Sequence, residues 1–102
     1  MNSKVDSEGR KDVIFEQLRQ FISEIIGKDV ADELNITYNS ILTKDLDMGS
    51  IEIVSFAEKV NKHYGKKIDF ISWLYKMDLK KIVNLSIGSI VDLIYDKIDK
   101  SL

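Results

Sequence analysis

The sequence predicts an all-α fold: a small four-helix bundle with a long first loop and an extended third-helix region. The chain of 102 residues contains no proline, and 44% of its residues are hydrophobic. Apolar residues recur at steps of three and four in three separate segments, which is the spacing of one helix face. A chain of this size buries one modest core, so we expect a single domain at residues 11–102. Residues 1–10 are polar and are expected to form a disordered tail.

The first helix is predicted over residues 11–26. Its apolar residues, from Ile14 to Ile25, follow the helical spacing, and Gly27 stands where a C-terminal cap belongs. Residues 28–49 lose this period but keep scattered apolar positions. We therefore expect a long loop across the core, with one helical turn near residues 29–34.

A second helix is predicted over residues 50–64, because apolar residues share one face and Gly65 follows. That face consists of Ile53, Phe56, Ala57, Val60 and Tyr64. The pattern over residues 69–85 is less regular and indicates one or two short helices. A last helix is predicted over residues 86–98, with Ser86 as its N-terminal cap.

Composition excludes several kinds of site. The chain has no cysteine, so it has no disulfide, thiolate zinc site or cysteine nucleophile, and its single histidine cannot form a multi-histidine metal site. A formal charge of -2 favours no nucleic-acid partner, and the pairs Lys66–Lys67 and Lys80–Lys81 are too short for a basic footprint. No run approaches the roughly 18 apolar residues of a membrane span, and the first ten residues lack an apolar core typical of an export signal. We expect a cytoplasmic protein.

No catalytic motif is present, so we expect a protein that is not an enzyme and binds no metal. His63 has no nucleophile near it in the sequence and is interpreted as a surface or half-buried residue. Aromatic residues in the second half of the chain lie at helical spacings, which favours core packing over a ligand site. They are Phe56, Tyr64, Phe70, Trp73 and Tyr75.

The stretch DLDMGSIEIV, residues 45–54, carries the candidate site. Ser50 stands where a polar turn meets the second helix, a common position for a helix cap. The same position exposes the hydroxyl near unpaired backbone N–H groups at the positive end of the helix dipole, which tolerates an attached anion. Ser50 is therefore a helix-start residue and a candidate attachment point.

The segment ILTKDLDMGSIEIVSFAEKVNKHY, residues 41–64, resembles the signature of acyl carrier proteins. Asp45 and Leu46 match the family's acidic-leucine pair, Ser50 matches its modified serine, and Ile51 takes the place of the usual leucine. The order of predicted helices over nearly the whole chain is similar too. The resemblance implies that Ser50 carries 4'-phosphopantetheine, added from coenzyme A by a phosphopantetheinyl transferase.

This resemblance implies a monomeric carrier that holds acyl thioesters for partner enzymes of fatty-acid, lipid or polyketide-type biosynthesis. Those partners are acyl-activating, synthase or acyltransferase enzymes. The chain departs from the family at Gly49, where Asp is usual, with Asp47 two residues earlier. Its segment between Ile68 and Ser86 is longer than usual, and its charge is closer to neutral. A specialised carrier explains these differences.

Two surfaces follow from this interpretation. Gly49 and Ile51 flank Ser50 and are expected to contact the attached cofactor. Partner enzymes are expected to dock on the turn before Ser50 and on the polar face of the second helix: Asp47, Met48, Glu52, Ser55, Glu58, Lys59 and Lys62. The apolar interior is expected to hold part of the acyl chain, lined by Phe56, Val60, Tyr64, Ile68, Phe70, Trp73 and Ile90. Two alternatives stay open: an aminoacyl or peptidyl carrier, and an unmodified helical interaction domain that binds a partner helix.

Overall fold

A computed structural model describes residues 3–65 and 68–100, with the backbone alone described for residues 3–8 and 99–100. These residues form helices and no strand, so the predicted all-α fold is confirmed. The helices are α1 (Ser3–Ile26), α2 (Lys28–Leu34), α3 (Ser50–Tyr64), α4 (Phe70–Tyr75), α5 (Leu79–Val83) and α6 (Ile87–Lys100).

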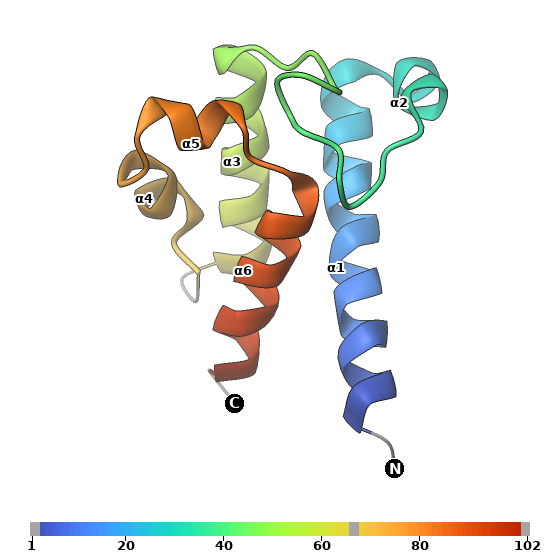
Figure 1. Cartoon of the computed structure of the whole chain (residues 1–102), viewed down its shortest axis with the longest axis vertical. Helices are drawn as coiled ribbons and strands as arrows, with labels where there is room; N and C mark the ends of the chain where they lie inside the picture. The colour runs from blue at the N-terminus through green and yellow to red at the C-terminus, as the bar shows by residue number, and fades with distance from the viewer. Residues whose placement is uncertain (1–2, 66–67, 101–102) are drawn as a thin grey trace.

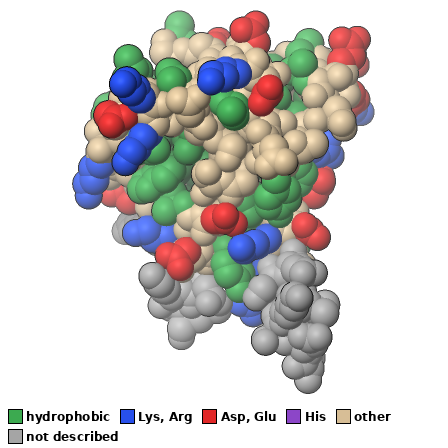
Figure 2. All heavy atoms as spheres, in the orientation of Figure 1, with side chains coloured by type: hydrophobic (Ala, Val, Ile, Leu, Met, Phe, Trp, Pro, Cys, Tyr) green, Lys and Arg blue, Asp and Glu red, His purple; other side chains and the backbone are tan. Residues whose placement is uncertain are grey.

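The three long helices build the bundle. α1 packs against α3 and α6, α2 folds back at the end of α1, and α4 packs beside α3 (Figure 1). The centre of the core consists of side chains that are fully buried: Leu18, Ile22, Phe56, Val60, Phe70, Ile87, Ile90, Val91 and Ile94. On the face drawn in Figure 2, charged side chains of both signs are spread over the surface. The apolar faces predicted for the three long helices thus meet in one core.

The prediction of a disordered tail over residues 1–10 is wrong for residues 3–10, which continue α1. Residues 1–2 lie outside the described part. Once the packed part of a helix exists, each further residue adds one backbone hydrogen bond. The added segment contains no proline, and its one weak position is Gly9, which costs about 1 kcal/mol relative to alanine in a helix.

The first helix ends where predicted. Gly27 has φ 103°, a conformation that favours glycine, and its N–H donates to the carbonyl of Ser23. The helical turn expected near residues 29–34 is α2, which buries Ala31. The chain therefore reverses at Gly27 and lays α2 against α1.

The second predicted helix has the predicted bounds, Ser50–Tyr64, and its end is capped by Gly65 at φ 71°. The region from 69 to 85 forms two short helices, in agreement with the sequence. Ser86 caps α6 as predicted, because its Oγ accepts from the N–H of Ser89 at 3.2 Å. The pair Lys66–Lys67 lies outside the described residues.

The loop from 35 to 49 is fixed to the segment before α6. Backbone hydrogen bonds join Leu42 N–H to Leu85 C=O at 3.1 Å and Ile87 N–H to Ser40 C=O at 3.0 Å. The Thr43 hydroxyl donates to the carbonyl of Val83. This loop is therefore held at its middle by residues about forty positions away in the sequence, and it leads directly into α3.

Candidate functional site

The turn before α3 places Ser50. Asp45 closes it, since its Oδ2 accepts from the N–H of Ile41 at 2.7 Å, while Leu46 and Met48 point into the core. Ser50 is the first residue of α3 and is exposed. The acidic-leucine pair therefore has a structural role here: the acid forms the turn, and the leucine anchors it.

Glu52 supplies a carboxylate at the start of α3. Its Oε1 accepts a hydrogen bond from the N–H of Gly49 at 2.8 Å. A carboxylate at a helix N-terminus is stabilised by the helix dipole and satisfies one backbone donor. Gly49 has no side chain, so no carboxylate at position 49 lies next to the exposed Ser50 hydroxyl. Asp47 is exposed and has a left-handed backbone, with φ 52°.

An apolar groove of about 730 Å³ begins at Ser50 and runs between α3 and the α4–α5 segment. This volume lies within the roughly 300–1,000 Å³ of small-molecule sites. The α3 wall and the turn contribute Thr43, Met48, Gly49, Ser50, Ile53, Val54, Ala57 and Glu58. The opposite wall consists of Ile71, Leu74, Tyr75, Met77, Leu79, Ile82 and Val83.

None of the seven residues predicted to line an acyl chain in the apolar interior lines this groove. Five of them fill the core instead: Phe56, Val60, Ile68, Phe70 and Ile90. The other two, Tyr64 and Trp73, are half-buried. The Phe70 ring packs edge to face on Phe56, with 6.2 Å between ring centroids, and stacks on Trp73 at 5.3 Å. These three rings therefore pack against one another in the interior where the acyl chain was expected. The spacing of Ile71, Leu74 and Met77 is the sequence signal that marks the observed wall.

The predicted docking face is only partly available. Glu58 and Lys62 are exposed, as is Asp47, while Ser55 is half-buried. Lys59 forms an ion pair with Glu24 of α1 at 3.0 Å. Met48 was expected on this face, and that expectation is wrong, since its side chain is 2% exposed.

Two apolar side chains that the prediction did not assign to docking are exposed beside Ser50. Ile51 was expected next to the attachment point and is 79% exposed, and Val54 is 56% exposed. Both lie within the first two turns of α3. The surface next to Ser50 is therefore apolar as well as charged, a composition typical of interaction sites.

His63 is exposed near the end of α3, in agreement with its interpretation as a surface residue. Its ring packs against Phe21 at 5.6 Å and Tyr64 at 4.7 Å. Burial raises the pKa of Tyr64 to about 12. These rings close the end of the bundle opposite Ser50 and carry no catalytic pair.

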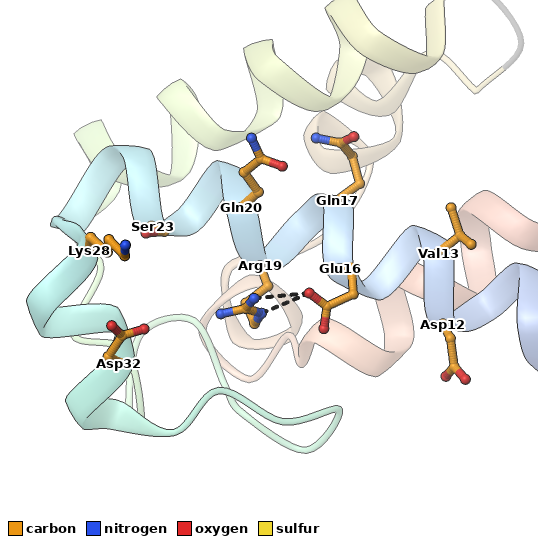
Figure 3. A pocket seen from close by; sticks show the side chains of 9 residues that line it. All are labelled: Asp12, Val13, Glu16, Gln17, Arg19, Gln20, Ser23, Lys28 and Asp32. Atoms are coloured by element: carbon orange, nitrogen blue, oxygen red, sulfur yellow. Dashed lines mark hydrogen bonds and ion pairs between the residues drawn. The ribbon is translucent and has the colours of Figure 1, made fainter.

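A second hollow, of about 720 Å³, lies along the outer side of α1 and the start of α2. Figure 3 shows its polar and charged side chains, with Lys28 and Asp32 contributed by α2 and the rest by α1. Arg19 pairs with Glu16 at 2.9 Å, which raises the pKa of the Arg19 guanidinium. None of the predicted site residues lines this hollow.

Within the described part of the chain, no group of three or more His, Cys, Asp or Glu side chains is placed to hold a metal ion. Among the helices described here, none combines the length and apolar character needed to cross a bilayer.

No protein-family model matches the chain, and no curated protein or solved structure is significantly similar to it. The function is therefore argued from the geometry around Ser50.

Proposed function

We propose that this protein is a carrier that holds acyl groups as thioesters on a 4'-phosphopantetheine arm attached to Ser50. One observation carries the proposal: an exposed serine hydroxyl stands at the first residue of a 15-residue helix and at the mouth of an apolar groove. The hydroxyl offers an attachment point, and the groove offers a place for an apolar cargo.

The residues around Ser50 fit a phosphodiester. The N-terminus of α3 presents its backbone N–H groups and the positive end of its dipole, which favours an attached anion. Glu52 uses the N–H of Gly49, which precedes the helix, and leaves the Ser50 hydroxyl exposed. Attachment forms a bond between Ser50 Oγ and phosphorus as the pyrophosphate of coenzyme A breaks, with the serine proton and adenosine 3',5'-bisphosphate leaving.

The arm would supply the thiol that a chain without cysteine lacks. The chain's own residues then have two tasks. The groove shields part of the cargo from water, and the exposed residues of α3 orient a partner enzyme. Tethering raises the effective concentration of the cargo at each partner without catalysis by the carrier.

On this proposal the protein is a cytoplasmic monomer that is not itself an enzyme. Its first partner is a phosphopantetheinyl transferase, and later partners are acyl-activating, synthase or acyltransferase enzymes. Neither nucleic acid nor a membrane is among them. Gly49, the more neutral charge and the two short helices α4 and α5 are consistent with a specialised carrier.

Intact mass tests the attachment. The protein is incubated with coenzyme A, Mg²⁺ and a broad-specificity phosphopantetheinyl transferase. We expect one added arm on the native chain and on Ser72→Ala, which removes another exposed serine, and none on Ser50→Ala. An unchanged native mass, or an arm on Ser50→Ala, contradicts the proposal.

The nature of the cargo is a separate question within the carrier class. Loading assays with acyl-activating and with amino-acid-adenylating enzymes distinguish an acyl carrier from an aminoacyl or peptidyl carrier. The apolar lining of the groove favours an acyl cargo, because an apolar chain gains free energy when it leaves water.

A further inference from the structure

Two large hydrophobic side chains stand exposed on the wall of the groove opposite α3. Tyr75, at the end of α4, is 84% exposed, and Leu79, at the start of α5, is 73% exposed. Both line the groove. Adjacent exposed side chains of this size gain free energy when a partner covers them, so together they mark an interaction site.

Lysines border these two side chains. Lys76, Lys80 and Lys81 are exposed, and none of them forms an ion pair within the described residues. The acid among them, Asp78, is engaged locally, because its Oδ1 accepts from the N–H of Lys81 at 3.0 Å. Figure 2 shows Lys or Arg side chains gathered over α4 and α5 beside hydrophobic ones. This segment is therefore basic, although the whole chain carries a charge of -2.

Acidic residues lie on the side of the groove opposite the lysines. Glu58 lines the α3 wall and is exposed, and Asp47 is exposed in the turn before Ser50. The lysines lie on the α4–α5 segment, next in sequence to residues of the other wall, and do not line the groove themselves. A surface that fits the groove must therefore present acidic groups toward α4 and α5 while avoiding further acids toward α3.

We propose that Tyr75 and Leu79, with Lys76, Lys80 and Lys81, form a docking surface for a partner protein that presents acidic side chains around an apolar patch. We call it the α4–α5 surface. Complementary charges attract the partner, and burial of Tyr75 and Leu79 holds it. This docking does not depend on the arm, so it stands or falls separately from the proposed function.

The charge pattern favours a protein over two other occupants. An anionic membrane is negative everywhere and would repel Glu58 and Asp47 beside the lysines. A second copy related by a two-fold axis through the α4–α5 surface would bring the lysines of the two copies close together, where they repel. A head-to-tail copy would set the α4–α5 surface against α3 and cover Ser50, and such contacts build a ring or an open filament of copies.

Photocrosslinking followed by affinity measurement tests the proposal. Leu79 is replaced by p-benzoylphenylalanine in the Ser50→Ala chain, and the variant is irradiated in an extract of the cells that produce the protein. Val13, which is 70% exposed on α1, receives the same group as the control. The protein crosslinked from position 79 is identified, purified, and titrated with the unlabelled chain over a series of salt concentrations.

We expect a partner that crosslinks from position 79 and not from position 13, through a region rich in Asp or Glu. Its Kd should rise with salt, and K80E/K81E should weaken binding about tenfold, because each reversal turns an attraction into a repulsion. Lys28→Glu, a reversal on α2, should leave the Kd unchanged. Reversal of the crosslinked acids on the partner should restore binding to K80E/K81E.

Four results would overturn the proposal. The first is a partner whose Kd is indifferent to salt and to K80E/K81E, with circular dichroism showing that the variant is folded. The second is a crosslink from position 79 only to another copy of this chain. The third is binding to phosphatidylserine-containing vesicles that K80E/K81E abolishes. The fourth is the absence of any crosslinked protein specific to position 79.

Discussion

The Glu52 carboxylate holds the backbone N–H of Gly49, with 2.8 Å between Oε1 and N, and a Cβ atom at position 49 would lie 2.9 Å from that same oxygen. The backbone of Gly49, at φ -86° and ψ -175°, is extended and open to any residue. What an added side chain disturbs is therefore the Glu52 carboxylate. The absence of an acid at position 49 and the presence of one at position 52 are parts of one arrangement at the start of α3.

This relationship predicts coupling between the two positions. Glu52→Ala removes the hydrogen bond, and Gly49→Ala displaces the carboxylate that makes it, so each should lower the free energy of unfolding by about 0.5–1 kcal/mol. The double variant should lower the free energy of unfolding by clearly less than the sum of the two single effects, because the same hydrogen bond is lost only once. Urea unfolding of the four proteins measures the cycle. Additive costs would show that the two residues act independently.

Substitution of two helical glycines should have opposite effects. A Cβ at Gly88 in α6 would lie 2.9 Å from the backbone oxygen of Tyr38, which accepts from the Gly88 N–H at 2.7 Å. Gly88→Ala should therefore destabilise the protein by roughly 1–3 kcal/mol. A Cβ at Gly9 in α1 meets nothing within 4 Å, so Gly9→Ala should stabilise it by up to about 1 kcal/mol. Thermal unfolding compares the pair, and equal shifts of both variants would contradict the argument.

Stability should fall in strong alkali because of Tyr64. Burial raises the pKa of its hydroxyl from 10.0 to about 12 in the folded state. The unfolded chain therefore ionises first, and the stabilisation present below pH 10 is lost as pH rises toward 12. Unfolding free energies measured across this range should fall less steeply in Tyr64→Phe. Tyr75→Phe, which alters an exposed ring, is the control, and an unchanged slope in Tyr64→Phe would exclude Tyr64 as the cause.

The groove predicts which side chains sense the cargo. If an acyl chain extends from the arm into the groove, methyl resonances of Ile53, Leu74 and Met77 should shift between the arm-bearing and the acylated protein. The buried methyls of Val91 and the indole N–H of Trp73 should not, because neither residue lines the groove. Nuclear magnetic resonance of the two forms makes the comparison. Shifts at Trp73 without shifts at Leu74 would place the chain elsewhere.

Much of the fold follows from local sequence. The bounds of α3 were predictable because Gly49 and Gly65 flank a regular apolar period, and the cap at Ser86 was predictable from its hydroxyl at a helix start. The N-terminal extension of α1 was not, because residues 3–10 have a weak pattern and are helical as a continuation of a packed helix. Local propensity alone does not set where such a helix begins.

The site was predictable in one part only. Ser50 is exposed at a helix start, as its sequence neighbours indicate. Met48 is buried because the turn packs on the core, and no period in residues 35–49 reveals this. Apolar spacing shows that Leu74 and Met77 face inward, but it does not show that a groove remains between α3 and the α4–α5 segment. That groove is a property of tertiary packing.

The attachment of residues 40–43 to residues 83–87 also sets an order of events during synthesis. The amide of Leu42 and the hydroxyl of Thr43 find their acceptors on Leu85 and Val83, so a nascent chain that has only reached Tyr64 contains the residues of α3 but lacks those acceptors. The hydrogen bonds that fix the loop leading to Ser50 can therefore form only after residues 83–85 have left the ribosome. On the proposed function, a transferase that requires this loop in its fixed position would modify the finished protein and not the growing chain.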